Sequence, residues 1–217
     1  PLTAWADAVI LHTNDVHCGI AKNIHIAAVT RYKHDLQKEN PEVILVDAGD
    51  ALQGEPLGSL SQGAAIIRIM NRAYDFAIPG NHEYDFGMDR FLALAPQLGC
   101  GYYSCNFIDK RTNDPVLKTH KNIPLDGKKI ALIGVTTPET LVSSTPKFFQ
   151  DANGKFIYGF CEDEDGTKLY AQVQKTVDKA RAEGAEYVIL VTHLGTNGAV
   201  PVWSSGAVAA HTSGINA

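Results

Sequence analysis

The chain has 217 residues, of which 45% are hydrophobic and 20% are charged, and its formal net charge is -5. This composition is typical of a globular protein, and the length suits one domain with a sizeable core. A net negative charge argues against a surface that coats nucleic acid, because such binding requires clustered Lys and Arg. No run approaches the roughly 20 apolar residues of a membrane-spanning helix, so no membrane span is expected in this chain.

The expected elements alternate between short apolar runs rich in Val and Ile, which predict buried strands, and longer stretches with helical periodicity. In chain order we expect a strand at 8–13, a helix at 24–39, a strand at 43–47, a helix at 63–74, a strand at 76–79, a helix at 85–98, a loop or hairpin at 106–129, a strand at 130–136, an irregular segment at 143–166, a helix at 167–183, a strand at 187–192, a helix-like stretch at 203–212 and the approach to a further strand at 213–217. Alternating strands and helices predict an α/β fold.

Polar motifs directly follow four of the expected strands. They are Asn14-Asp15-Val16-His17, Gly49-Asp50, Gly80-Asn81-His82-Glu83 and His193. Functional groups collect at the carboxyl ends of strands in α/β sheets, and Asp, His and Asn supply the oxygen and nitrogen ligands of divalent metals. Each motif alone is equally typical of a turn or a helix cap. Four of them in this order indicate a metal site and metal-assisted hydrolysis.

This ordered set resembles the calcineurin-like metallophosphoesterase superfamily. Residues 11–17 (LHTNDVH) and 80–87 (GNHEYDFG) resemble the 5'-nucleotidase family within it. The resemblance implies an α/β fold in which a β-sandwich is flanked by helices, in αββα layers, with its last strand or strands missing. It also implies two divalent metal ions, either Zn, Mn, Fe or Co, held by Asp15, His17, Asp50, Asn81 and His193, with Asp50 bridging the two.

The resemblance assigns further roles beside the ligands. His82 is implied to face the phosphate and Asp85 to hold its imidazole, so that these two form the catalytic pair. Asn81 and His82 would contact the substrate, and Glu83 is interpreted as a supporting or capping residue. The implied partner is a small-molecule nucleotide, whose phosphate ester would be hydrolysed by attack of a metal-bridging hydroxide. An alternative within enzymes is a 2',3'-cyclic nucleotide or nucleotide-sugar phosphodiesterase.

Two parts of the family pattern are absent from the sequence. The family supplies one further ligand to each metal from a Gly-His-x-His segment, and it stacks the nucleobase in a C-terminal domain; neither follows Ala217. Residues 7–217 are therefore interpreted as an incomplete metallophosphoesterase domain. An inactive truncated metal-binding module is the alternative of another class. A lost final strand would expose a sheet edge, which predicts pairing with a second copy of the chain.

Residues 4–6 (Ala-Trp-Ala) have the small-x-small form of a signal-peptidase site. Residues 1–6 are therefore interpreted as the remnant of a leader or of added sequence, and a secreted, cell-surface or periplasmic protein is expected. Among the cysteines, Cys100 and Cys105 could bridge across a turn, but buried free thiols are favoured.

The remaining histidines and aromatic residues carry no motif. We expect His25, His34, His120 and His211 at the surface, and His12 in the core or beside the ligands. The aromatic residues are expected in the core rather than as base-stacking platforms; they include Tyr102, Tyr103, Phe148, Phe149 and Trp203.

Overall fold

The computed structural model describes residues 8–20 and 25–217. The expected leader remnant at 1–6 and the start of the first expected helix lie outside the described residues. The strands are β1 (Val9–Thr13), β2 (Val43–Asp47), β3 (Phe76–Ala77), β4 (Ile108–Asp109), β5 (Asp114–Pro115), β6 (His120–Leu125), β7 (Lys128–Thr136), β8 (Tyr158–Gly159) and β9 (Tyr187–His193). The α-helices are α1 (Ile26–Gln37), α2 (Pro56–Ser61), α3 (Ala64–Met70), α4 (Met88–Leu94), α5 (Thr140–Ser143), α6 (Thr167–Ala182) and α7 (Ser205–His211), with short 3-10 turns at His82–Tyr84, Ala95–Gln97, Pro146–Phe149 and Pro201–Trp203.

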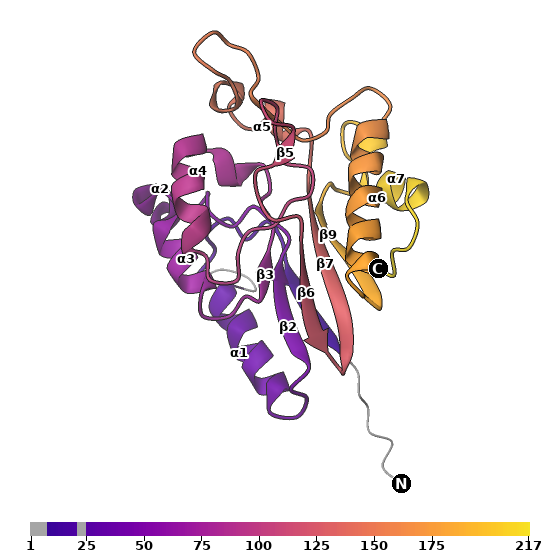
Figure 1. Cartoon of the computed structure of the whole chain (residues 1–217). Helices are drawn as coiled ribbons and strands as arrows, with labels where there is room; N and C mark the ends of the chain where they lie inside the picture. Colours follow the sequence, from indigo (N-terminus) through magenta and orange to yellow (C-terminus); the bar gives the residue numbers. More distant parts are fainter. Residues whose placement is uncertain (1–7, 21–24) are drawn as a thin grey trace.

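Two sheets pack face to face between two layers of helices (Figure 1). In the first sheet β1, β2 and β3 are parallel, and in the second β7 pairs antiparallel with β6 and parallel with β9. Between the sheets lies an apolar core that includes Val46, Phe76, Leu132 and Val191. Helices α1 to α4 cover the outer face of the first sheet, and α6 and α7 cover the second. The structure therefore confirms the expected α/β fold and its αββα layers.

The burial of individual elements explains why these sequences adopt these structures. All five residues of β2 are buried, because this strand has a neighbour on each side and a packed layer on each face. Such a strand needs the continuous apolar run that the sequence shows. In α6, Leu169, Val173 and Val177 recur at every fourth position and are fully buried against the second sheet. The helix is therefore held by one apolar stripe.

The expected elements are confirmed at their centres and differ at their ends. The hairpin β6–β7 turns at Asp126 and Gly127, whose φ angles of 51° and 66° suit a tight two-residue hairpin turn. Strand β3 is shorter than expected, and α2 and the small sheet β5-β4-β8 were not predicted. The last residues of the chain lie beside β9 and form strand-like backbone hydrogen bonds with it, as expected for the approach to a further strand. Asn216 N–H donates to Val188 O at 2.8 Å, and Leu190 N–H donates to Ala217 O at 2.9 Å.

Several side-chain expectations have clear outcomes. The prediction that His120 lies at the surface is wrong, because its side chain is 7% exposed and its Nε2 lies 2.9 Å from Glu183 Oε2. His12 is exposed rather than in the core. All four cysteines are free, and Tyr102, Tyr103 and Phe149 are buried in the core. No helix in the described part of the chain is long and apolar enough to cross a membrane.

An ion pair between a buried lysine and a half-buried aspartate links α1 to the amino end of β3. Lys33 is 6% exposed, and its Nζ donates to Ala73 O at 2.6 Å and to Asp75 Oδ2 at 2.5 Å. The same carboxylate oxygen accepts the N–H of Leu45 at 2.7 Å. These contacts lie at the end of the first sheet opposite to the polar motifs, so they bear on stability alone.

Candidate metal centre

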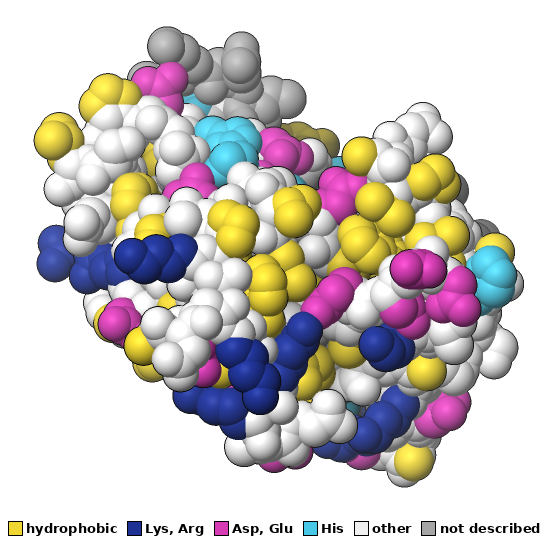
Figure 2. Space-filling view, turned by 90° about the horizontal axis from the view of Figure 1, so that it is seen from above, with side chains coloured by type: hydrophobic (Ala, Val, Ile, Leu, Met, Phe, Trp, Pro, Cys, Tyr) yellow, Lys and Arg dark blue, Asp and Glu magenta, His cyan; other side chains and the backbone are white. Residues whose placement is uncertain are grey.

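The polar motifs meet where the parallel strands end. Two groups of side chains have ligand atoms within 4.8 Å of one another: His17, Asp50 and His82 in one, and Asp15, Asp50 and His193 in the other. Asn81 joins them, since its Oδ1 lies 3.3 Å from His193 Nε2. Figure 2 looks down on this end of the molecule and shows histidine and acidic side chains beside one another on its surface. All the residues that the sequence singled out as ligands are thus brought together.

Asp50 belongs to both groups and is 2% exposed. Its Oδ1 accepts the N–H of His82 at 2.8 Å, and its Oδ2 lies 3.3 Å from His193 Nε2 and 3.9 Å from His17 Nε2. Burial opposes the charge of this carboxylate, but the hydrogen bond and charge of His193 outweigh it and hold the pKa of Asp50 below its usual value. An ionised carboxylate is therefore shared between the two groups.

Both histidines beside Asp50 are oriented by backbone carbonyls. His193 Nδ1–H donates to Ala48 O at 2.8 Å, and His17 Nδ1–H donates to Gln53 O at 3.0 Å. A hydrogen bond at Nδ1 fixes the tautomer in which Nε2 carries a lone pair, and metal-binding histidines are commonly held in this way. Burial lowers the pKa of His193, but Asp50, the Ala48 carbonyl and the charge of Glu83 together raise it to about 9. Without metal the imidazole is therefore protonated on both nitrogens at neutral pH, and a cation must displace the Nε2 proton.

The loops after β2 and β3 lie so close together that a Cβ at Gly80 would overlap atoms of Asp50. Gly49 and Asp50 have positive φ angles of 99° and 62°, which turn the chain sharply after β2. A Cβ at Gly80 would lie 2.2 Å from Asp50 Oδ1 and 2.8 Å from its backbone nitrogen. Glycine is therefore required at residue 80, because any side chain there would displace the shared carboxylate.

The carboxylate of Glu83 lies behind these loops and is 1% exposed. It accepts four backbone N–H groups: Oε2 those of Gly80 at 2.6 Å and Asp50 at 2.8 Å, and Oε1 those of Ala51 at 2.7 Å and Leu52 at 3.1 Å. The expected capping or supporting position of Glu83 is thus observed, with more partners than a helix cap has.

His82 is part of a hydrogen-bonded chain. Its Nδ1 lies 2.6 Å from Asp85 Oδ2, and Ser144 Oγ donates to Asp85 Oδ1 at 2.9 Å. Burial lowers the pKa of His82, but the hydrogen bond with Asp85 and the negative charges of Asp50, Asp85 and Glu83 together outweigh burial, so the net shift is upward. With Nδ1 occupied, Nε2 is the nitrogen left for other partners. Ser144 was not predicted, because a lone Ser in an irregular segment carries no sequence signal.

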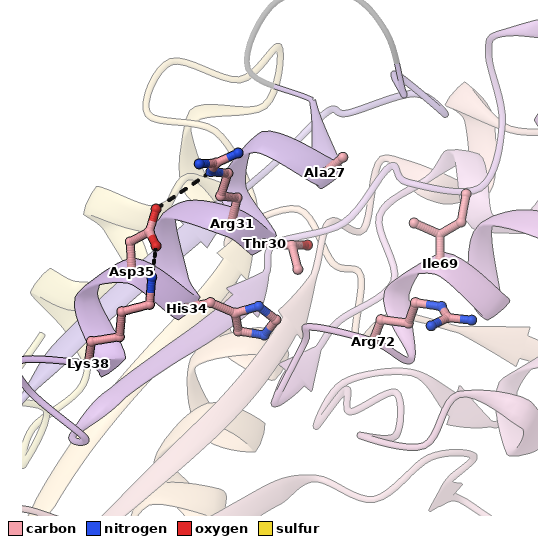
Figure 3. Close-up of a pocket in the computed structure, with 8 residues that line it drawn as sticks. All are labelled: Ala27, Thr30, Arg31, His34, Asp35, Lys38, Ile69 and Arg72. Carbon is pink, nitrogen blue, oxygen red and sulfur yellow. Dashed lines mark hydrogen bonds and ion pairs between the residues drawn. The ribbon is translucent and has the colours of Figure 1, made fainter.

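A cleft of about 430 Å³ adjoins the ligands. Asp15 and His193 line it together with His12, Asn14, Ala48, Thr192, Gly195, Thr196 and Ser205. A larger groove of about 620 Å³ lies between α1 and α3 and is drawn in Figure 3. There Asp35 holds Lys38 at 2.5 Å and Arg31 at 3.7 Å. Because this groove contains none of the converging ligands, the cleft beside Asp15 is the better candidate for substrate.

A second buried carboxylate, Asp47, predicts a pH-dependent stability. Burial and the negative charge of Glu83 raise the pKa of Asp47 from 3.8 to about 8. Above pH 4 the unfolded chain ionises this group while the folded chain keeps it protonated. We therefore expect its contribution to the free energy of unfolding to fall from pH 4 to pH 8, by up to about 1.4 kcal/mol per pH unit.

The variant Asp47→Asn tests this expectation by urea unfolding of chelator-treated protein between pH 4.5 and 8. An amide fits the position, since its oxygen can accept the N–H of Gly49 and its nitrogen can donate to Thr13 Oγ1, which now donates to Asp47. The difference in free energy between wild type and variant should decline as the pH rises. Parallel profiles would show that Asp47 ionises normally in the folded protein.

The fold and this convergence of ligands define a domain of the metallophosphoesterase type. The family model described as calcineurin-like phosphoesterase matches residues 8–216, and the chain belongs to this family.

Individual relatives are similar over most of the chain. A 5'-nucleotidase of Vibrio vulnificus is 27% identical over 214 residues, which cover 90% of this chain and 36% of that protein. The NAD nucleotidase of Haemophilus influenzae superposes with a TM-score of 0.70 at 26% identity, over 86% of this chain and 34% of its own. YfkN of Bacillus subtilis, a calcineurin-like phosphoesterase, gives a TM-score of 0.75 at 22% identity over 96% of this chain and 69% of its own. The chain thus spans about a third of the length of the curated relatives that it matches.

Proposed function

We propose that this chain is the catalytic domain of a dinuclear-metal phosphoesterase that hydrolyses the phosphate esters of nucleotides. One observation carries the proposal: the Nε2 atoms of His17 and His193, each oriented through Nδ1 by a backbone carbonyl, converge on the buried carboxylate of Asp50. Membership of the calcineurin-like phosphoesterase family supports the reaction class. The names of the similar 5'-nucleotidase and NAD nucleotidase support a nucleotide substrate.

The donor set fits two divalent cations. Asp15, His17 and Asp50 would hold the first, and Asp50, Asn81 and His193 the second. Mixed carboxylate, imidazole and amide donors suit Zn, Mn, Fe or Co rather than Mg or Ca, which prefer oxygen alone. When bound, such a pair lowers the pKa of a shared water and neutralises charge on phosphoryl oxygens.

The protein's own groups would then orient the ester and move a proton. We infer that Asn81 and His82 contact the phosphoryl group, since both lie at the edge of the ligand cluster. A protonated His82 can stabilise the phosphoryl charge or transfer its Nε2 proton to the leaving alkoxide. Asp85 favours this protonated form, because its hydrogen bond raises the pKa of His82. Asp85, itself held by Ser144, fixes the ring orientation.

A phosphodiester or nucleotide-sugar substrate is the second candidate. It is favoured by the structural similarity to a NAD nucleotidase, whose name indicates a dinucleotide substrate. Parallel assays on a nucleoside 5'-monophosphate, a 2',3'-cyclic nucleotide and a nucleoside diphosphate sugar separate these candidates. The preferred ester is the one with the largest kcat/KM.

Metal content and turnover of the purified chain test the proposal directly. We expect two equivalents of manganese or zinc by elemental analysis after dialysis, and hydrolysis of a nucleoside monophosphate that a chelator abolishes. Arg72→Ala in the α1–α3 groove serves as a control and should change neither result. Bound metal without turnover on any ester would favour a non-catalytic metal-binding module. A chain that retains no metal would overturn the proposal.

The expected location outside the cytoplasm is part of the same proposal. It rests on the signal-peptidase pattern at residues 4–6, which lie outside the described part of the chain. Fractionation of cells that express the protein from its natural gene would test it.

A further inference from the structure

The buried carboxylate of Glu83 contacts backbone rather than substrate or ligand side chains. Three of its four N–H donors are consecutive, from Asp50, Ala51 and Leu52, and the fourth belongs to Gly80. Consecutive N–H groups that converge in this way form a concave site for an anion. Here the protein supplies the anion itself. The loop after β2 is therefore folded around a side chain that comes from the loop after β3.

The loop after β2 also binds the segment after β1, which carries Asp15 and His17, through backbone hydrogen bonds. Asp15 N–H donates to Gly49 O at 3.0 Å, His17 N–H to Asp50 O at 2.9 Å, and Cys18 N–H to Ala51 O at 3.0 Å. His17 and Asp50 both have left-handed φ angles, 45° and 62°. L-residues rarely adopt this conformation unless surrounding contacts impose it. Glu83 and these backbone bonds supply such contacts for both residues.

The side chain of Asp50, in the loop after β2, in turn binds the backbone of the loop after β3. Its Oδ1 accepts the N–H of His82, one residue before Glu83, so the two loops bind each other reciprocally. Because Oδ1 is occupied in this way, Oδ2 is the oxygen directed at His17 and His193. The direction of Oδ2 therefore depends on the path of residues 50–52, which Glu83 determines.

We propose that Glu83 is a positioning residue that sets the shared carboxylate of Asp50, and through it the segment of Asp15 and His17, in a geometry ready for metal. This inference rests on the proposed function, since it concerns affinity for the two cations. Glu83 has no free lone pair for a metal, because four N–H groups occupy both of its oxygens. Its hydrogen bonds act on the ligands through backbone, and its negative charge also acts on His82 and His193 through space.

The isosteric variant Glu83→Gln tests the proposal. An amide nitrogen in place of either oxygen would face two N–H donors, so that residues 50–52 or Gly80 must shift. We expect the affinity for manganese or zinc, measured by competition with a chromophoric chelator, to fall at least about 10-fold, as for other groups that orient metal ligands. The measurement is made well below the unfolding temperature of every variant.

Lys33→Met provides a matched control for general destabilisation. It removes the ion pair of the buried Lys33 at the opposite end of the first sheet, so it should lower the Tm of the metal-free protein. Metal affinity should stay within about twofold, since distant sites are usually independent. Glu83→Asp is measured beside Glu83→Gln, because Glu83→Gln also removes a negative charge near the cations. Glu83→Asp keeps the charge and both oxygens but withdraws the oxygens by one methylene, and a loss of affinity is expected here too.

The outcomes separate this inference from the proposed function. Wild-type affinity in Glu83→Asp would overturn the positioning role, assign any loss in Glu83→Gln to the missing charge, and leave the proposed function intact. Loss of affinity in Lys33→Met in proportion to its lower Tm would also overturn it, because affinity would then follow overall stability. A wild-type chain that binds no metal would instead remove the proposed function itself.

Discussion

Asp50→Asn is expected to abolish the dinuclear site while leaving the fold intact. The amide oxygen can still accept the N–H of His82, so the Tm of the metal-free protein should change little. Its nitrogen, however, would present hydrogens to His193 and His17 where Oδ2 now lies. Elemental analysis should find at most one metal per chain, with an affinity at least about 100-fold lower. Turnover should fall together with the metal content, because hydrolysis by this class of site requires two cations to stabilise the phosphoryl oxygens.

A second readout of Asp50→Asn needs no metal. Asp50 raises the pKa of His193 to about 9, whereas burial acts to lower it. With the carboxylate removed, the pKa of His193 should drop by NMR titration of the chelator-treated protein. The control Asp89→Asn makes the same chemical change in the exposed first turn of α4 and should alter neither metal content nor this titration. Two tightly bound ions in Asp50→Asn would contradict the bridging role.

His82→Ala is expected to retain both metals and lose turnover. General acid catalysis by a positioned histidine contributes about 10²- to 10⁴-fold, and we expect kcat to fall within this range. Metal content is the essential companion measurement, because a ring nitrogen of His82 lies within 4.8 Å of ligand atoms of His17 and Asp50. A lost cation would show that His82 is a ligand and would contradict the role proposed for it.

The leaving group distinguishes two ways in which His82 can act. An acidic phenol needs no proton as it departs, whereas a nucleoside alkoxide does. If His82 protonates the leaving oxygen, the loss in His82→Ala should be much smaller on p-nitrophenyl phosphate than on a nucleoside monophosphate. Equal losses on both esters would indicate that His82 stabilises charge on the phosphoryl group instead. Asp85→Asn should reproduce part of either pattern, since it removes the charge that favours protonated His82.

The convergence of the metal ligands could be predicted from the sequence, because each ligand follows a predicted strand. The apolar runs at 43–47 and 187–192 predicted strands, and the polar residues that follow them were expected near the carboxyl ends of these strands. The apolar runs alone predicted only alternating strands and helices. The arrangement as a β-sandwich came from the family resemblance. Which strands belong to which sheet was not predicted, because periodicity does not reveal which strands pair.

The supports of the ligands could not be predicted, because they are mostly backbone atoms. Ala48 O and Gln53 O orient the two histidines, yet any residue supplies a carbonyl. Ser144 reaches Asp85 across 59 positions, and no local pattern marks such a contact. His120 was misplaced for a similar reason, since its burial depends on Glu183 from the end of α6. Each of these supports is a contact between residues far apart in the sequence, which local patterns do not reveal.

The ligand set straddles the seam between the two sheets. Asp15, His17, Asp50 and Asn81 follow strands of the first sheet, whereas His193 ends β9 of the second. Polar contacts that cross this seam near the site include the hydrogen bonds from His193 Nδ1–H to Ala48 O and from Thr136 Oγ1–H to Pro79 O. Cations bound here would link the two sheets, because each sheet contributes ligands. Because a ligand that binds only the folded state stabilises it, metal supply would govern the thermal stability of the protein as well as its turnover.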